Sequence, residues 1–167
     1  MQNKSKNNVS ILKLTLFVAL FAAAGYFREY FFVQINNILY MKYYNTDSTL
    51  AVGTIMKVFE RMNYATLYYL KYPFTIIWTA AFFLLNLSCI KHLSTDRSKN
   101  FKSLLVFYAI MLGIAGLSMA FSFIINGTWE TDEYTLSRWL FGVAQSPIPA
   151  LILLAAATLR EKVQTTA

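Results

Sequence analysis

Four long apolar runs alternate with polar segments along this chain of 167 residues. The runs cover approximately residues 9–27, 72–90, 103–125 and 138–159. A helix of about 19 residues is roughly 28 Å long, close to the hydrocarbon thickness of a bilayer. The pattern predicts an all-α membrane protein with four transmembrane helices, forming a single integral domain over residues 1–167.

The section between the first two runs, residues 28–71, has a mixed pattern. Its first half reads as an interfacial continuation of the first helix. Over residues 49–71 apolar side chains recur at helical spacing, which predicts a second, amphipathic helix. Lys57, Glu60 and Arg61 make a membrane span costly there, so we expect one or two interfacial helices. The residues that carry the helical spacing are Val52, Ile55, Met56, Phe59, Met62, Leu67 and Leu70.

Helix ends are also suggested by the sequence. Asp47 or Ser48 is placed to cap the amphipathic helix. Pro73 suits the first turn of the helix that follows. Ala22–Ala24 fits a signal-peptide cleavage site, but apolar and aromatic residues continue beyond it, which favours a retained first span.

Composition supports the membrane assignment. Apolar residues make up 57% of the chain and charged residues 14%, against about 25% in soluble domains. The net charge of +7 comes from basic residues that flank the apolar runs, which is typical of membrane topology. We therefore expect the lipid bilayer as a partner, with other membrane proteins or a second copy of the chain as further candidates, and no nucleic acid.

The distribution of charge predicts an orientation. With four spans, the basic N-terminal end, the segment 91–102 and the C-terminal tail all lie on one side. The segment 126–138 is acidic. The positive-inside rule then predicts both termini in the cytoplasm, with residues 28–71 and 126–138 facing outward.

Small residues form stripes on the last two runs, and such stripes allow close helix packing in a bilayer. We expect these two helices to pack along them. The stripes consist of Ala109, Gly113, Gly116 and Ala120 on the third run, and of Gly142, Ser146 and Ala150 on the fourth.

The fourth run contains an unusual interruption at Gln145, Ser146, Pro147 and Pro149. The two prolines remove backbone donors and free the carbonyls of Val143 and Gln145. Two interpretations stay open: a broken helix whose carbonyls bind an ion or polar substrate, or a kink stabilised by local side chains or a neighbouring helix.

A second polar cluster is a candidate on the outer side. Arg28 and Glu29 follow the first run, and Glu60 and Arg61 join them if the amphipathic segment folds back. These four side chains form either a polar site or an interfacial anchor. Asn86, the strongly polar residue of the second run, is expected to hydrogen-bond a neighbouring helix.

Motifs of recognisable chemistry are absent from the sequence. There is one cysteine, Cys89, and one histidine, His92, so no metal-ligand cluster can be assembled from them. No nucleophile–base pair, phosphate loop or dinucleotide motif occurs. The sequence therefore predicts no cofactor, no metal and no catalytic residue.

The segment Arg28-Glu29-Tyr30-Phe31-Phe32-Val33-Gln34-Ile35-Asn36, directly after a first span, resembles small uncharacterised four-span proteins of Bacteroidota-type bacteria. The resemblance implies a bacterial inner-membrane protein and carries no activity.

Three functions follow in order of preference. The first is an accessory or scaffold protein acting through helix–helix and interfacial contacts. The second is a small transporter or lipid-handling protein using the broken fourth helix and the outer charged cluster. The third is a membrane enzyme using Glu29 or Glu60 as acid or base.

Overall fold

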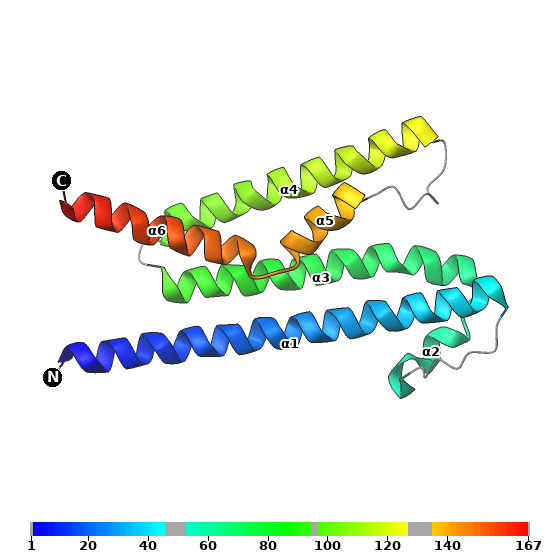
Figure 1. The fold of residues 1–167 in the computed structure, drawn as a ribbon, viewed down its shortest axis with the longest axis horizontal. Coiled ribbons are helices and arrows are strands. Elements are labelled where there is room, and N and C mark those ends of the chain that lie inside the picture. The colour runs from blue at the N-terminus through cyan, green and yellow to red at the C-terminus, as the bar shows by residue number, and fades with distance from the viewer. Residues whose placement is uncertain (1, 46–52, 95–96, 127–134, 167) are drawn as a thin grey trace. The chain divides into compact units, whose positions relative to one another are not determined.

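The computed structural model describes residues 2–45, 53–94, 97–126 and 135–166, and every regular element in these ranges is helical. The elements, drawn in Figure 1, are α1 (Gln2–Tyr44), η1 (Thr54–Met56), α2 (Lys57–Glu60), α3 (Tyr64–Leu93), α4 (Arg97–Asn126), α5 (Thr135–Ala144) and α6 (Ile148–Thr166).

Three of these helices are long and apolar enough to cross a membrane. They are found within Ile11–Tyr44, Tyr64–Leu93 and Ser98–Phe121. The pair α5 and α6 passes the same test only jointly, and the two helices are bent by 62° at the break between them. The described residues therefore contain three membrane-length helices, or four if the bent pair counts as one span, which indicates an integral membrane protein.

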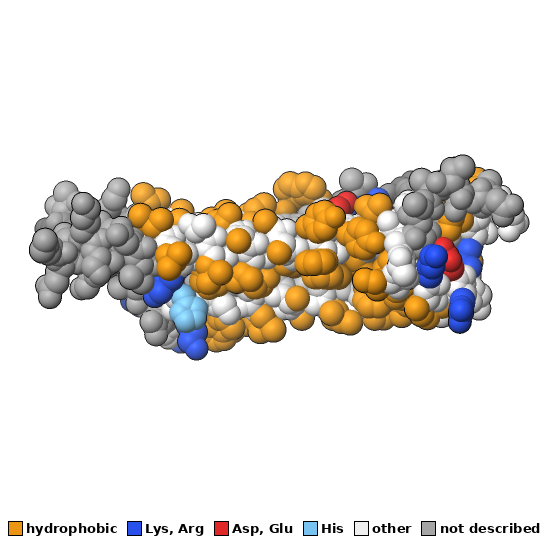
Figure 2. All heavy atoms as spheres, turned by 90° about the horizontal axis from the view of Figure 1, so that it is seen from below, with side chains coloured by type: hydrophobic (Ala, Val, Ile, Leu, Met, Phe, Trp, Pro, Cys, Tyr) orange, Lys and Arg blue, Asp and Glu red, His pale blue; other side chains and the backbone are white. Residues whose placement is uncertain are grey.

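The exterior fits a lipid environment. Side chains such as Leu12 (71% exposed) and Leu117 (72% exposed) turn outward from their helices. Hydrophobic side chains are also spread along the middle of the face drawn in Figure 2. Such exposure is unfavourable in water and favourable against lipid tails.

The first helix does not end where its apolar run ends. α1 continues without interruption through Arg28 and Glu29 to Tyr44. No proline follows Phe27 within this stretch, so nothing in the backbone stops the helix. It ends at Asn45, whose φ of 49° is the left-handed conformation that asparagine tolerates at a helix C-terminus.

The predicted amphipathic helix over residues 49–71 is wrong as a single element. The described part of that range contains the short η1 and α2, a turn, and the start of α3 at Tyr64. Asn63 caps α3, because its Oδ1 accepts a hydrogen bond from the Thr66 N–H at 2.7 Å. The capping candidates Asp47 and Ser48 lie outside the described residues.

Pro73 was also misplaced by the sequence pattern. It lies inside α3 and not in its first turn. Because proline has no N–H, the carbonyl four residues earlier lacks its helical donor. Beside this point, the Thr75 hydroxyl donates to the Lys71 carbonyl at 2.8 Å.

Backbone contacts divide the chain into two compact units. One consists of residues 22–80, and the other of residues 1–21 and 81–167. The prediction of a single domain stays a prediction, and each unit is described by itself.

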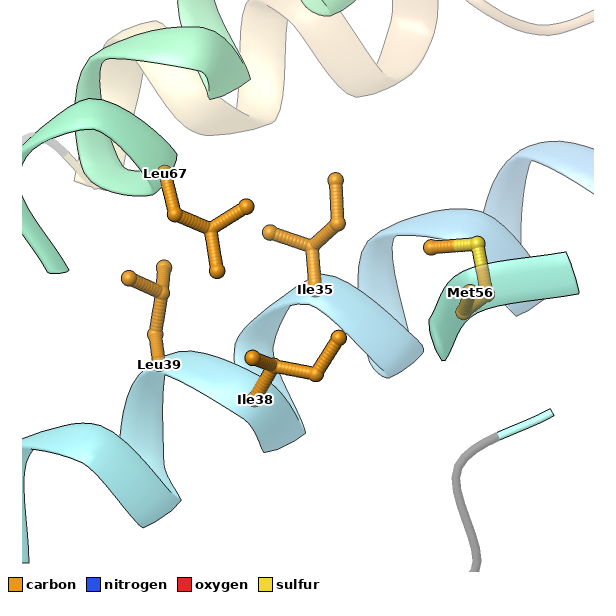
Figure 3. Packing of buried hydrophobic residues seen from close by; sticks show 5 residues of the cluster. All are labelled: Ile35, Ile38, Leu39, Met56 and Leu67. Atoms are coloured by element: carbon orange, nitrogen blue, oxygen red, sulfur yellow. The ribbon is translucent and has the colours of Figure 1, made fainter. Parts of the chain in front are cut away.

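The unit of residues 22–80 has its own apolar core. Ile35, Ile38 and Leu39 of α1 meet Met56 of η1 and Leu67 of α3, as Figure 3 shows. All five side chains are buried, and Ile35, Ile38 and Leu67 are fully so. The spacing of the three α1 residues puts them on one helix face.

In the other unit, α4 packs against α5 and α6. The buried side of α4 carries Leu104, Tyr108 and Ala115, which recur at spacings of four and seven residues. The C-terminal part of α3 also has a buried side, formed by residues at helical spacing. These residues are Phe82, Asn86, Cys89 and Ile90.

Candidate functional site

The break between α5 and α6, where the two helices are bent by 62°, is the candidate site. The helix stops at Ala144 and resumes at Ile148. The interruption includes Gln145, Ser146 and Pro147, and Pro149 follows in the first turn of α6. The backbone carbonyls of residues 143 to 146 therefore lose their usual helical donors, since an α-helix pairs each carbonyl with the N–H four residues later.

Ser146 satisfies the break locally. Its hydroxyl donates to the Val143 carbonyl at 2.6 Å. The same oxygen accepts from the Ile148 N–H at 3.2 Å. One hydroxyl thus replaces the donor that Pro147 lacks and also holds the first amide of α6.

Tyr108 reaches the break from α4. Its hydroxyl donates to the Ala144 carbonyl at 2.7 Å, and the side chain is buried. Ala144 needs this donor, because the Ile148 N–H that would serve it in a continuous helix is taken by Ser146. Tyr108 therefore ties the end of α5 to α4.

Asn86 reaches the break from α3 and is fully buried. Its Oδ1 accepts from the Ala150 N–H at 3.0 Å, and its Nδ2 lies 3.0 Å from the Ser146 carbonyl. In a continuous helix the Ala150 N–H would bond to that same carbonyl. The carboxamide of Asn86 is inserted between the two groups and satisfies both.

The Asn86 amide has two protons and three acceptors within reach. Besides the Ser146 carbonyl, these are the Tyr108 hydroxyl at 3.1 Å and the Phe82 carbonyl at 2.9 Å. The Phe82 carbonyl is also the helical acceptor of the Asn86 backbone N–H. The Tyr108 hydroxyl has given its own proton to Ala144, so it accepts from Asn86 without conflict.

We call this set the break network: Asn86, Tyr108 and Ser146, with the backbone of residues 143–150. It joins four helices, α3, α4, α5 and α6, through groups that are mostly buried. The carbonyls of Val143, Ala144 and Ser146 all receive donors from the chain itself. Its chemistry is that of a stabilised bend, which is the second of the two interpretations left open by the sequence.

Gln145 is buried at the end of α5. The residue is 4% exposed, and its backbone N–H still bonds to the Phe141 carbonyl at 2.9 Å. The last turn of α5 thus extends through Gln145 before the chain bends. Pro149 is fully buried at the start of α6, where a missing N–H costs little.

Arg28 and Glu29 lie on α1, whereas Glu60 ends α2 and Arg61 follows it. Glu29, Glu60 and Arg61 are exposed, and Arg28 is half-buried with its guanidinium 5.9 Å from the centre of the Phe32 ring. This placement is that of a side chain whose stem follows apolar surface.

The small-residue stripe of α4 is not the face that contacts α5 and α6. Ala109, Gly113, Gly116 and Ala120 are all exposed, and a Cβ built on either glycine has no atom within 4 Å. The covered face includes Tyr108, one residue and about 100° away. Packing of this face places the buried Tyr108 hydroxyl beside the break, which provides the hydrogen-bond partner that a buried tyrosine needs.

The second stripe is divided. Ser146 and Ala150 contact Asn86 through their backbone atoms. Gly142 has open space where a Cβ would lie. We predicted that the two stripes pack closely on each other. The described residues do not show this packing.

Tyr108 was missed by the sequence reasoning. The usable signal was its position: it lies inside an apolar run and not at the ends of the run, where tyrosines normally gather at the membrane–water interface.

Among the described residues, no group of three or more His, Cys, Asp or Glu side chains is placed to hold a metal.

Comparison of the chain with protein-family models, with curated proteins and with solved structures finds no match. The resemblance at residues 28–36 stays a prediction.

Proposed function

We propose that this chain is a small multi-pass accessory or scaffold protein of the bacterial inner membrane, acting through helix–helix and interfacial contacts. It has four spans, with α5 and α6 forming the last, and both termini in the cytoplasm. The observation that supports this best is the break network, in which the buried polar groups form hydrogen bonds with one another. A scaffold needs a stable interior and an exterior with contact surfaces, and no reacting group.

The exposed face of α4 is the contact surface that supports the proposal. Gly113 and Gly116 lie on a membrane-length helix with no atom of the described chain near a Cβ built on them. Small residues let another helix approach closely, which stabilises association in lipid through van der Waals contact. The same stripe that fails to pack within the chain is therefore available to a second helix.

The transporter alternative depends on carbonyls at the break that are free to accept from a ligand. Three of them already accept from Ser146, Tyr108 and Asn86. An ion would have to displace these donors, so no specific observation favours this function. For the enzyme alternative, Glu29 and Glu60 are both exposed, without the burial that tunes a catalytic carboxylate.

Crosslinking in cells tests the proposal. A photoreactive amino acid at Leu117, which is 72% exposed on α4, is expected to capture a membrane protein or a second copy of the chain. The double substitution Gly113→Leu and Gly116→Leu should reduce the captured product several-fold, because the added side chains prevent close approach.

Gly25→Leu is the matched control, since Gly25 is also helical and has open space at its Cβ position. It should leave the crosslink unchanged. Absence of any crosslinked protein from position 117, with normal membrane insertion, would contradict the scaffold role.

A further inference from the structure

The hook, defined as residues 53–61 and containing η1 and α2, has two different faces. Met56 is 3% exposed and Phe59 is half-buried, and both turn toward α1. Figure 3 shows Met56 beside Ile35 and Ile38. Residues three apart share a face of a short helix. The alternate pair, Ile55 and Val58, forms the opposite face.

This opposite face is strongly apolar and strongly exposed. Ile55 is 82% exposed and Val58 is 65% exposed. Ile55 has the highest exposure among the large hydrophobic residues in the described part of the chain. The next most exposed, Ile124, Leu117 and Leu12, lie on helices long enough to span a membrane, whereas Ile55 does not.

The hook is held firmly, so this exposure is not the result of a loose segment. The Gly53 N–H donates to the Gln34 Oε1 at 3.2 Å, and the Lys42 Nζ donates to the Glu60 carbonyl at 2.6 Å. Both ends of the hook are thereby fixed to α1. Gly53 also permits a close approach, because a Cβ there would lie 1.8 Å from the Tyr30 hydroxyl oxygen.

Ring contacts define the position of the hook along α1 and α3. The Phe59 ring lies 5.9 Å from that of Phe31 on α1 and 6.1 Å from that of Phe74 on α3, and Phe31 and Phe74 are 4.5 Å apart. Phe74 is at the start of the apolar run of α3. On its polar side, the Lys71 Nζ donates to the Asn36 Oδ1 at 3.1 Å.

Phe59 therefore lies where α3 passes from polar to apolar residues. On α1, Arg28 and Glu29 precede Phe31 by about one turn, a rise of roughly 3–5 Å. This level thus combines charges with aromatic rings, the composition of a membrane–water interface.

Charges on the hook suit a phospholipid surface. Lys57 and Arg61 are exposed and flank Val58, and Glu60, also exposed, leaves a net charge of one positive unit on the hook. An ammonium and a guanidinium complement phosphate oxygens. Apolar side chains surrounded by basic ones are typical of segments that lie in the headgroup region.

We propose that the hook is a lipid-binding surface, in which Ile55 and Val58 enter the headgroup–acyl boundary and Lys57 and Arg61 bind the phosphates of anionic phospholipids. This deepens the proposed function and rests on it, since it names the partner of the interfacial contacts. Its occupant is the bilayer that surrounds the protein's own spans.

The test uses the full chain with Cys89→Ala and one added cysteine, Ile55→Cys, labelled with an environment-sensitive fluorophore and reconstituted into vesicles. Vesicles contain phosphatidylcholine with or without phosphatidylglycerol. We expect quenching by aqueous iodide to be several-fold weaker at position 55 than at Tyr44→Cys, a control site that is 58% exposed at the end of α1. Lipids brominated near the headgroup should quench position 55 and spare position 44.

The charge requirement is tested with Lys57→Gln and Arg61→Gln together. Protection at position 55 should increase when phosphatidylglycerol is added, and this increase should disappear in the double variant. Val58→Cys provides a second labelling site with the same expected result.

Equal iodide quenching at positions 55, 58 and 44 in both kinds of vesicle would overturn the proposal. Protection in cell membranes but not in pure lipid would also overturn it, since a protein would then cover the hook. Neither result affects crosslinking through α4, so the scaffold role is tested separately.

Discussion

Asn86 acts as a substitute for a missing helical hydrogen bond. A continuous helix would pair the Ser146 carbonyl with the Ala150 N–H, and the Asn86 carboxamide satisfies both with its own donor and acceptor. An amide is suited to this because it has the same pair of groups as a peptide bond. No apolar side chain of similar size can do the same, and there is no water in the hydrocarbon region to replace it.

Replacing Asn86 with leucine should therefore destabilise the fold. We expect Asn86→Leu to lower the free energy of unfolding in detergent or bicelles by about 1–3 kcal/mol, the usual cost of leaving buried polar groups without partners. Ser88→Leu is the control, because Ser88 is exposed on the same helix, and its effect should stay within about 0.5 kcal/mol. Equal stability of the two variants would mean that the break does not depend on Asn86.

Tyr108 gives a second test at this scale. Tyr108→Phe removes the donor to the Ala144 carbonyl and one acceptor of Asn86, and should cost about 1 kcal/mol. Because the two residues share one network, the cost of combining Tyr108→Phe with Asn86→Ala should differ from the sum of the single costs by roughly 0.5 kcal/mol or more. Additive effects in a double-mutant cycle would show that the two residues stabilise the break independently.

At the scale of elements, the proline inside α3 has a measurable consequence. Pro73 lies in the helix interior and is exposed, so an alanine there should meet no steric obstacle. Pro73→Ala adds an N–H that can bond to the Tyr69 carbonyl, and should stabilise the unit of residues 22–80 by about 1–3 kcal/mol. Hydrogen exchange around residues 69–75 should slow accordingly, while exchange near the break in the other unit should not change.

Apolar periodicity predicted the membrane-length helices but not where they end. The run up to Phe27 correctly indicated a helix, yet α1 continues to Tyr44 because polar residues do not stop a helix without a backbone reason. The start of α3 at Tyr64 was missed because its cap, Asn63, lies inside an apparently continuous amphipathic pattern. Local spacing cannot tell one long helix from the short η1 and α2 that pack back on α1.

The polar site was partly readable. Two prolines two residues apart indicated the interruption, and an asparagine in an apolar run indicated an interhelical hydrogen bond. Which helix supplies the partner of Asn86 depends on contacts 60 and 64 residues apart in sequence, and one sequence does not specify such pairings. The stripes of small residues were misleading for the same reason, since they do not state which helix they face.

For the whole molecule, orientation is the property to measure. In the Cys89→Ala background, single cysteines are placed at His92, which is exposed near the end of α3, and at Asn45, which is exposed at the end of α1. With both termini cytoplasmic, a membrane-impermeant maleimide should label Asn45→Cys in intact spheroplasts and His92→Cys only after the membrane is opened. Labelling of position 92 in intact spheroplasts would require the opposite orientation.

The break network also constrains how the protein is made. α3 leaves the ribosome before α5 and α6, so Asn86 reaches the membrane when the backbone of residues 146–150 has not yet been synthesised. During that interval the side-chain amide of Asn86 can donate to the Phe82 carbonyl, which lies one turn away on the same helix. The bonds to the Ser146 carbonyl and the Ala150 N–H can form only after α5 and α6 have been synthesised. A segment translated later thus completes the interior of a helix that precedes it in the chain.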